Sequence, residues 1–173
     1  MTYRVKLSNR SMNRNHLNHK MIKPVIINGN EFIDERGRIK FVNEFRFTKV
    51  KRFYTVENSS TEFIRAWQGH RYEKKYFYVV SGSYRIALIE IKDWRNPDRT
   101  LKCETFDLPC STPQILSVPE GYANGFRALE ENSIMLVFSN KSLESSMNDD
   151  HRWSPEYFTC TKQVFNLKSF YDG

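Results

Sequence analysis

The chain has 173 residues, of which 39% are hydrophobic and 14% aromatic, so it is long enough to bury one domain core and is not a disordered polymer. No stretch approaches the roughly 18 apolar residues of a membrane span. The net charge of +7 comes largely from residues 1–23, which carry six basic and no acidic side chains. We therefore expect a basic arm over 1–23, solvated or against a partner subunit, and a single domain over 24–173. The rest of the chain is nearly neutral and lacks a basic stripe, so nucleic acid is not expected as a partner.

After residue 23 apolar residues alternate with a period of two, which predicts strands and not helices. Turn residues bound these segments, and the strands recur about every 8–12 residues, a spacing typical of an all-β sandwich or barrel. The predicted strands are Pro24–Asn28, Ile39–Phe47, Lys49–Val56, Phe63–Trp67, Lys75–Val80, Tyr84–Ile91, Leu101–Leu108, Ile115–Val118, Gly125–Leu129 and Ile134–Phe138. Lys75–Val80 and Tyr84–Ile91 flank Ser81-Gly82-Ser83, which predicts a β-hairpin.

Helix is expected only near the C-terminus. Ser154-Pro155-Glu156 has the form of an N-cap followed by an N1 proline, so a short helix should begin there. The final segment, Gln163–Tyr171, fits either a closing strand or a helical turn.

The cysteines indicate a reducing compartment. Cys103, Cys110 and Cys160 are odd in number and show no CxxC spacing, which predicts reduced thiols in a cytoplasmic protein. The first residues lack the apolar core of a signal peptide, which leads to the same expectation. The four histidines are scattered along the chain, so no zinc site is predicted.

The densest group of polar residues runs from Arg65 to Lys75 and includes Gln68 and His70. If the segment lines the mouth of a barrel, an imidazole, several cations and a phenol would meet near one cavity. Those groups suit proton abstraction beside a ketone, where a base takes the proton and a cation stabilises the enolate oxygen. The alternative is a satisfied loop histidine beside a solvated rim of cations.

Two further motifs are tight turns. In Val118–Phe126 a strand stops at a proline, turns over two glycines and re-enters the sheet with Asn124 between small neighbours. In Asp34–Gly37 a turn presents Arg36. Each motif alone indicates only a β-turn or corner.

Together, and in this order, the motifs resemble a known superfamily. Asp34–Gly37 resembles the D-x-R-G start of dTDP-4-dehydrorhamnose 3,5-epimerases, and Val118–Phe126 (VPEGYANGF) resembles their IPEGFAHGF motif. Residues 50–83 are closer in spacing to the dTDP-4-oxo-6-deoxyglucose 3,4-ketoisomerases. The resemblance implies an all-β cupin, a double-stranded β-helix or jelly-roll barrel, that binds a nucleotide sugar, uses no cofactor or metal and forms a homodimer.

Three positions depart from the pattern of these enzymes. Gln68 stands where both groups keep the histidine base, Asn124 where the epimerases keep a second histidine, and Val137 where their catalytic tyrosine lies. Arg65, His70 and Lys75 match. The metal-ligand set H-x-H…E…H of cupin oxygenases is absent, so metal chemistry is not expected.

The resemblance implies a cytoplasmic nucleotide-sugar epimerase or ketoisomerase of surface-polysaccharide synthesis. His70 would be the base, and Arg65 and Lys75 would stabilise the enolate, with Tyr72, Tyr78 or Tyr84 as acid. Substrate contacts would come from Arg36, Gln68, Tyr78, Tyr84 and Asn124. Two alternatives stay open: a non-catalytic nucleotide-sugar-binding or scaffold cupin, and an enzyme acting on a different substrate in the same kind of pathway.

Overall fold

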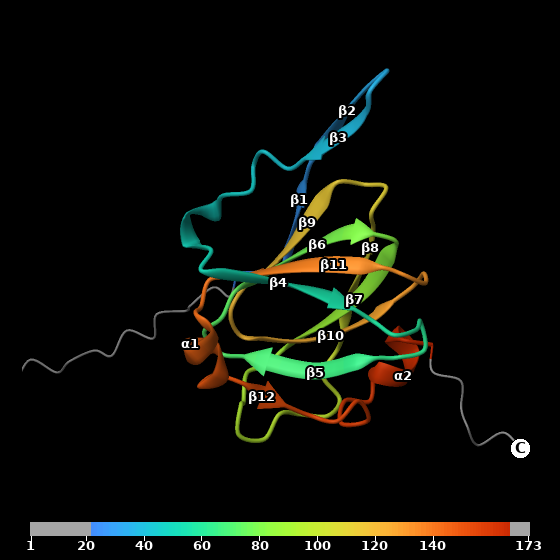
Figure 1. Cartoon of the computed structure of the whole chain (residues 1–173). Coiled ribbons are helices and arrows are strands. Elements are labelled where there is room, and N and C mark those ends of the chain that lie inside the picture. The colour runs from blue at the N-terminus through green and yellow to red at the C-terminus, as the bar shows by residue number, and fades with distance from the viewer. Residues whose placement is uncertain (1–21, 167–173) are drawn as a thin grey trace, which may run out of the picture.

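The computed structural model describes residues 22–166, and almost all of their regular structure is antiparallel β-sheet. The predicted basic arm lies outside these residues except for its last two. Two five-stranded sheets face each other (Figure 1). In spatial order the first contains β1 (Val25–Asn28), β9 (Gln114–Val118), β6 (Lys75–Ser81), β11 (Ile134–Ser139) and β4 (Arg52–Glu57). The second contains β12 (His151–Arg152), β5 (Arg65–His70), β10 (Tyr122–Ala128), β7 (Ser83–Glu90) and β8 (Glu104–Pro109).

The main core lies between the two sheets, because alternate residues of each strand point inward. On β7 the inward side chains include Tyr84, Ile86 and Leu88, all almost fully buried. Phe77 on β6 and Val137 on β11 belong to the same cluster from the opposite sheet. The predicted all-β cupin barrel is therefore confirmed.

The predicted hairpin of Lys75–Val80 and Tyr84–Ile91 is wrong. The two strands exist as β6 and β7, but β6 pairs with β9 and β11 in one sheet, while β7 pairs with β8 and β10 in the other. Gly82 lies where the chain crosses between the sheets, with a φ of +67°. A Cβ there would lie 2.1 Å from Ser133 Oγ, so glycine is required for both reasons. The glycine turn that predicted a hairpin is instead a corner of the barrel, where the chain passes from one sheet to the other.

Several predicted boundaries shift. Ile39–Phe47 is strand only to Phe41, in β3 (Gly37–Phe41), which pairs with β2 (Asn30–Asp34) in a hairpin that projects from the barrel (Figure 1). A 3-10 helix, η1 (Phe47–Lys49), follows. Strand β5 (Arg65–His70) begins two residues later than predicted and continues three residues past the predicted end at Trp67.

The helices are short. Helix α1 (Leu143–Met147) was not predicted, and it begins after Ser142, whose side chain accepts a hydrogen bond from the Ser145 backbone. The predicted C-terminal helix is present but begins later than Ser154, as α2 (Thr161–Val164). The rest of the predicted closing element lies beyond residue 166, outside the described residues. None of the helices within residues 22–166 is long and apolar enough to cross a membrane.

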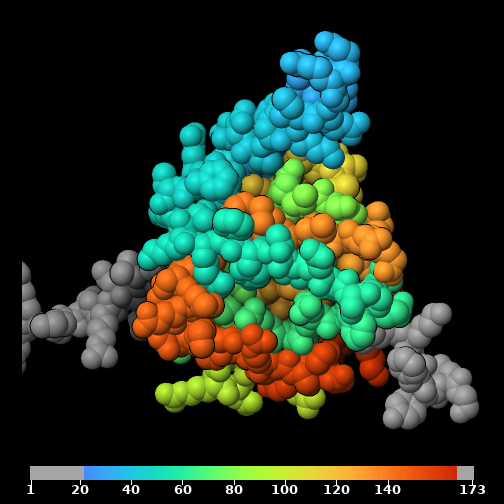
Figure 2. Space-filling model, viewed as in Figure 1, coloured from blue at the N-terminus to red at the C-terminus, as the bar shows by residue number. Residues whose placement is uncertain are grey.

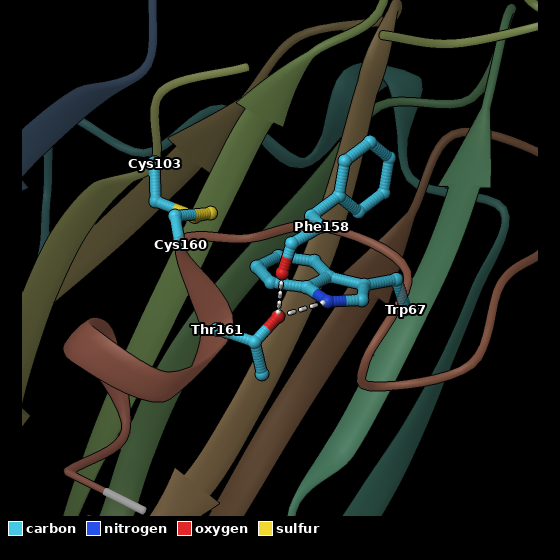
Figure 3. The surroundings of a disulfide bond; sticks show 5 residues. All are labelled: Trp67, Cys103, Phe158, Cys160 and Thr161. Atoms are coloured by element: carbon cyan, nitrogen blue, oxygen red, sulfur yellow. Dashed lines mark hydrogen bonds between the residues drawn. A yellow bond between two sulfur atoms is a disulfide. The ribbon is translucent and has the colours of Figure 1, made fainter. Parts of the chain in front are cut away.

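A C-terminal segment, residues 153–165, covers the outer face of the second sheet. Phe158 and Phe165 are buried there against Trp67, whose indole nitrogen donates to Thr161 Oγ1 at 3.0 Å. Figure 3 shows that a disulfide between Cys103 and Cys160 lies beside this contact. The prediction of reduced thiols is therefore wrong for these two cysteines, and Cys110 alone is free. The pairing was hidden because 57 residues separate the two positions in sequence.

Candidate functional site

A cavity of about 700 Å³ lies at one end of the barrel, between β4, β5, α1 and β12. In Figure 2 the surface is hollowed between the teal band of β4 and the orange-to-red band that contains α1 and β12. The wall carries more positive than negative side chains: Arg52, Arg65, Lys75 and Arg152 against Glu57 and Asp150. Such a cavity suits a small anionic ligand.

Lys75 is the most deeply buried charged group on this wall, with 4% of its surface exposed. It is the first residue of β6, and the pleat that turns Phe77 into the core turns Lys75 the same way. Its Nζ donates to Gln68 Oε1 at 2.9 Å. Burial lowers the pKa of Lys75 to about 8, although Glu73 opposes the shift. A lysine in this range can both lose and regain a proton near neutral pH.

Gln68 connects Lys75 to a carboxylate. Its Nε2 donates to Asp150 Oδ1 at 2.8 Å, and Arg152 Nε donates to Asp150 Oδ2 at 2.8 Å. Partial burial raises the pKa of Asp150, but the hydrogen bonds from Gln68 and Arg152 outweigh it and the pKa is lowered. Asn124 faces Gln68 on β10 and donates to its carbonyl oxygen at 2.7 Å. Both amides line the cavity.

Glu73 is a buried carboxylate close enough to Lys75 to influence its charge. It accepts hydrogen bonds from Ser139, Ser146 and Arg52. Burial raises the pKa of Glu73, but the Ser146 hydroxyl and the nearby Lys75 charge lower it more. This carboxylate therefore stays ionised and offsets the buried positive charges.

His70 is buried behind the wall and does not line the cavity. Only 2% of the residue is exposed, and its Nδ1 lies 3.2 Å from Glu73 Oε2 without hydrogen-bond geometry. Burial, and next the charge of Lys75, lower the pKa of His70 to about 4, so the imidazole is neutral and the contact is not an ion pair at pH 7. This position does not favour His70 as the residue that takes a proton from a substrate.

Tyr54 is a phenol on the cavity wall that the sequence analysis missed. It lies on β4 directly opposite Val137, the residue that replaces a catalytic tyrosine in the resembling epimerases. The Arg52 guanidinium lies 5.1 Å from the centre of its ring. Burial raises the pKa of Tyr54 to about 12, so the hydroxyl stays protonated over the physiological range. The i, i+2 spacing of Arg52, Tyr54 and Val56 could have placed all three on one inward face.

The other predicted residues divide between the cavity and distant positions. Arg65 lines the cavity, while its guanidinium bonds Asn58 and the Glu57 carbonyl oxygen. Arg36 lies on the projecting hairpin and pairs with Asp34. Tyr84 is fully buried and donates to backbone carbonyls of Val56 and Ser133.

Two other predicted tyrosines also lie away from the cavity wall. Tyr78 is on the outer face of its sheet, one position out of phase with the inward-pointing Phe77, and Tyr72 is 62% exposed. Asp150 and Arg152, which no sequence signal indicated, reach the cavity through the pairing of β12 with β5. Within residues 22–166 no group of three or more His, Cys, Asp or Glu side chains is placed to hold a metal ion.

No protein-family model matches the sequence, and no curated protein matches it. Solved structures do match. The QdtA 3,4-ketoisomerase from Thermoanaerobacterium thermosaccharolyticum aligns with a TM-score of 0.61 and 17% identity over 85% of this chain and 99% of that one. The rmlC epimerase of Mycobacterium tuberculosis aligns with a TM-score of 0.63 and 18% identity over 86% of this chain and 75% of that one. The dTDP-4-dehydrorhamnose 3,5-epimerase of Sulfolobus tokodaii aligns with a TM-score of 0.62 and 23% identity over 78% of this chain and 79% of that one. The predicted resemblance is confirmed in the fold that the chain shares with both groups of enzymes.

Proposed function

We propose that this protein is a nucleotide-sugar epimerase or ketoisomerase that moves protons beside a keto group without a cofactor. The observation that carries the proposal is Lys75, a buried amine with a pKa near 8 on the wall of a cation-rich cavity. The fold adds support, because a solved ketoisomerase of this fold is bound to TDP-4-keto-6-deoxyglucose. We take a dTDP-4-keto-6-deoxyhexose as the substrate class and surface-polysaccharide synthesis as the setting.

The proposed chemistry assigns a role to three cavity residues. The neutral amine of Lys75 takes a proton from the carbon next to the carbonyl; the C–H electron pair forms a C=C bond, and the carbonyl oxygen becomes negative. The Arg65 cation stabilises that enolate oxygen. Tyr54, protonated because its pKa is about 12, supplies the proton that returns to carbon or to the oxygen. Lys75 thus takes the role of base that the sequence assigned to His70.

Hydrogen exchange tests the proposal directly. The protein is incubated with dTDP-4-keto-6-deoxyglucose in heavy water, and deuterium at C3 or C5 is followed by NMR. We expect the exchange rate to rise with pH through about 8, since the neutral fraction of Lys75 increases there. Lys75→Met should abolish exchange, and Tyr54→Phe should slow it roughly 10²- to 10⁴-fold.

Matched variants control for structural damage. Lys74→Met removes a neighbouring lysine that pairs with Glu120 outside the cavity wall, and Tyr78→Phe removes a phenol from the outer face of the sheet. Both should exchange like the unmodified protein. Full exchange by Lys75→Met would remove Lys75 as the base, and no exchange by any form would remove the proposed reaction for this substrate.

A second candidate is a nucleotide-sugar-binding cupin without catalysis. It is favoured by His70, which is buried and does not line the cavity, and by the amides Gln68 and Asn124 at positions where the resembling enzymes keep histidines. Calorimetry with dTDP separates the candidates when combined with exchange, because this one predicts binding with no deuterium incorporation.

We also propose that the protein is a homodimer in the cytoplasm, as the resemblance implies. The Cys103–Cys160 disulfide offers a test of this location, because such bonds persist mainly in oxidising compartments. In the cytoplasm this pair would be kept as two thiols, and blocking free thiols at the moment of cell lysis distinguishes the two locations.

A further inference from the structure

The amide of Gln68 lies between a donor and an acceptor at the inner end of the cavity. It accepts from Lys75 Nζ at 2.9 Å and donates to Asp150 Oδ1 at 2.8 Å. We propose that Gln68 and Asp150 are positioning residues that hold one N–H of Lys75 in place, so that the exchangeable proton or lone pair of the amine faces the cavity. The inference rests on the proposed function and names how this chain works without a histidine at position 68.

Asp150 fixes which way the amide points. An ionised carboxylate only accepts hydrogen bonds, so the NH2 group of Gln68 must face it and the carbonyl oxygen must face Lys75. Arg152 occupies the second carboxylate oxygen and keeps Asp150 in place. The amide therefore has one orientation, set from the loop before β12 and not from its own strand.

The same hydrogen bond survives both protonation states of Lys75. An ammonium has three N–H groups and a neutral amine has two and a lone pair, so one N–H can stay on Gln68 Oε1 in either state. What changes on titration is then the part of the amine directed elsewhere. A histidine would act as base itself, whereas Gln68 has no proton to exchange and can only direct the neighbouring amine.

Several charged groups surround this amine, and each bears on its titration. They are Arg52 on β4, His70 on β5, Glu73 on the loop before β6, Asp150 before β12 and Arg152 on β12. Glu73 and Asp150 favour the ammonium, while Arg52 and Arg152 disfavour it. The carbonyl of Gln68 is a neutral acceptor in this group, and its replacement by a charged or apolar side chain should move the titration in opposite directions.

The test measures the titration of Lys75 without substrate and the exchange reaction with it. The ¹³Cε shift of Lys75, assigned by its loss in Lys75→Met, is followed against pH in lysine-labelled protein. Gln68→Glu should raise the midpoint by about one unit or more, and Gln68→Leu should lower it. At pH 7 the exchange rate of Gln68→Glu should fall about tenfold for each unit and recover at higher pH. Gln163→Glu adds the same charge at an exposed position and should leave the midpoint unchanged.

The variant Asp150→Asn tests the hydrogen bond between Gln68 and Asp150. An asparagine can donate or accept, so Gln68 loses its fixed orientation. The Lys75 midpoint should fall, because the carboxylate charge that favours the ammonium is removed and the amide oxygen no longer stays on the amine. Equal midpoints in the unmodified protein, both Gln68 variants and Asp150→Asn would overturn the inference. Shifted midpoints without any deuterium exchange would uphold the positioning and defeat the proposed reaction instead.

Discussion

Buried titratable side chains at one end of this barrel have very different environments. Lys75 and His70 both lose affinity for a proton through burial, yet Lys75 lines the cavity and His70 does not. Lys75 therefore has access to a ligand, whereas His70 contributes to the packing around Glu73. The two residues are almost equally buried, so what distinguishes them is contact with the cavity.

The buried His70 should make the protein sensitive to acid. Its pKa is about 4 in the folded state against an ordinary value of 6.5, so between these values the unfolded chain binds a proton that the folded chain does not. The free energy of unfolding should therefore fall as the pH drops from about 6.5 to about 4, by a His70 contribution on the order of 3 kcal/mol. Urea unfolding across this range measures it.

The comparison variant is His70→Asn, which removes the titrating group and leaves Glu73 to titrate in both proteins. Above pH 7 the difference in unfolding free energy between the two proteins should be constant. Below that it should change in favour of the variant, while parallel curves from pH 7 to pH 4 would contradict the assignment.

Only part of the site was predictable at this scale. Arg65, Lys75, Gln68 and Asn124 were predicted from sequence and line the cavity. Arg36 and Tyr84 were also predicted, but Arg36 lies on the projecting hairpin and Tyr84 is fully buried in the core. Motif spacing identifies a residue's neighbours along the chain, while the side it faces depends on where each strand begins.

At the scale of elements, individual strands were more predictable than their partners. Alternation of apolar residues indicated both β6 and β7 correctly, but nothing local to Ser81–Ser83 distinguishes a hairpin from a corner between two sheets. The two-residue strand β12 is too short to leave a pattern, and it supplies Arg152 to the cavity through pairing with β5. The partners of each strand and the position of Arg152 thus depend on long-range pairing, which no local sequence pattern indicates.

The C-terminal segment is the element most dependent on a covalent link. The Cys103–Cys160 disulfide joins it to the loop that precedes β8, next to the buried Phe158. We expect Cys103→Ser to lower the free energy of unfolding by about 2–4 kcal/mol, because the unfolded chain loses its cross-link. Urea unfolding without reductant gives the value.

Thiol counting provides the control. The protein unfolded without reductant should titrate one thiol, that of Cys110, and three after reduction. Cys110→Ser should leave the reductant-sensitive loss of stability intact. Three reactive thiols in unreduced protein, or equal stability of Cys103→Ser and the unmodified protein, would show that the bond does not form in solution.

For the molecule as a whole, the two sheets differ in what covers their outer faces. The C-terminal segment buries the outer face of the second sheet. On the first sheet, within residues 22–166, Phe53 is 68% and Val80 is 53% exposed. Phe53 and Phe47 both contact Phe138, with ring centres 6.4 and 5.6 Å apart. A contiguous exposed aromatic face of this kind is typical of a surface that another protein covers.

We therefore expect the outer face of the first sheet to form the interface of the proposed homodimer. Phe53→Glu puts a charge at its most exposed ring, and burying that charge without a partner would cost several kcal/mol, enough to separate the subunits. Light scattering should give twice the 20.6 kDa chain mass for the unmodified protein and the single-chain mass for the variant. Phe63→Glu, at a ring that is 59% exposed on the loop before β5, should remain dimeric. A monomeric unmodified protein would reject the dimer, and a dimeric Phe53→Glu would place the interface on another face.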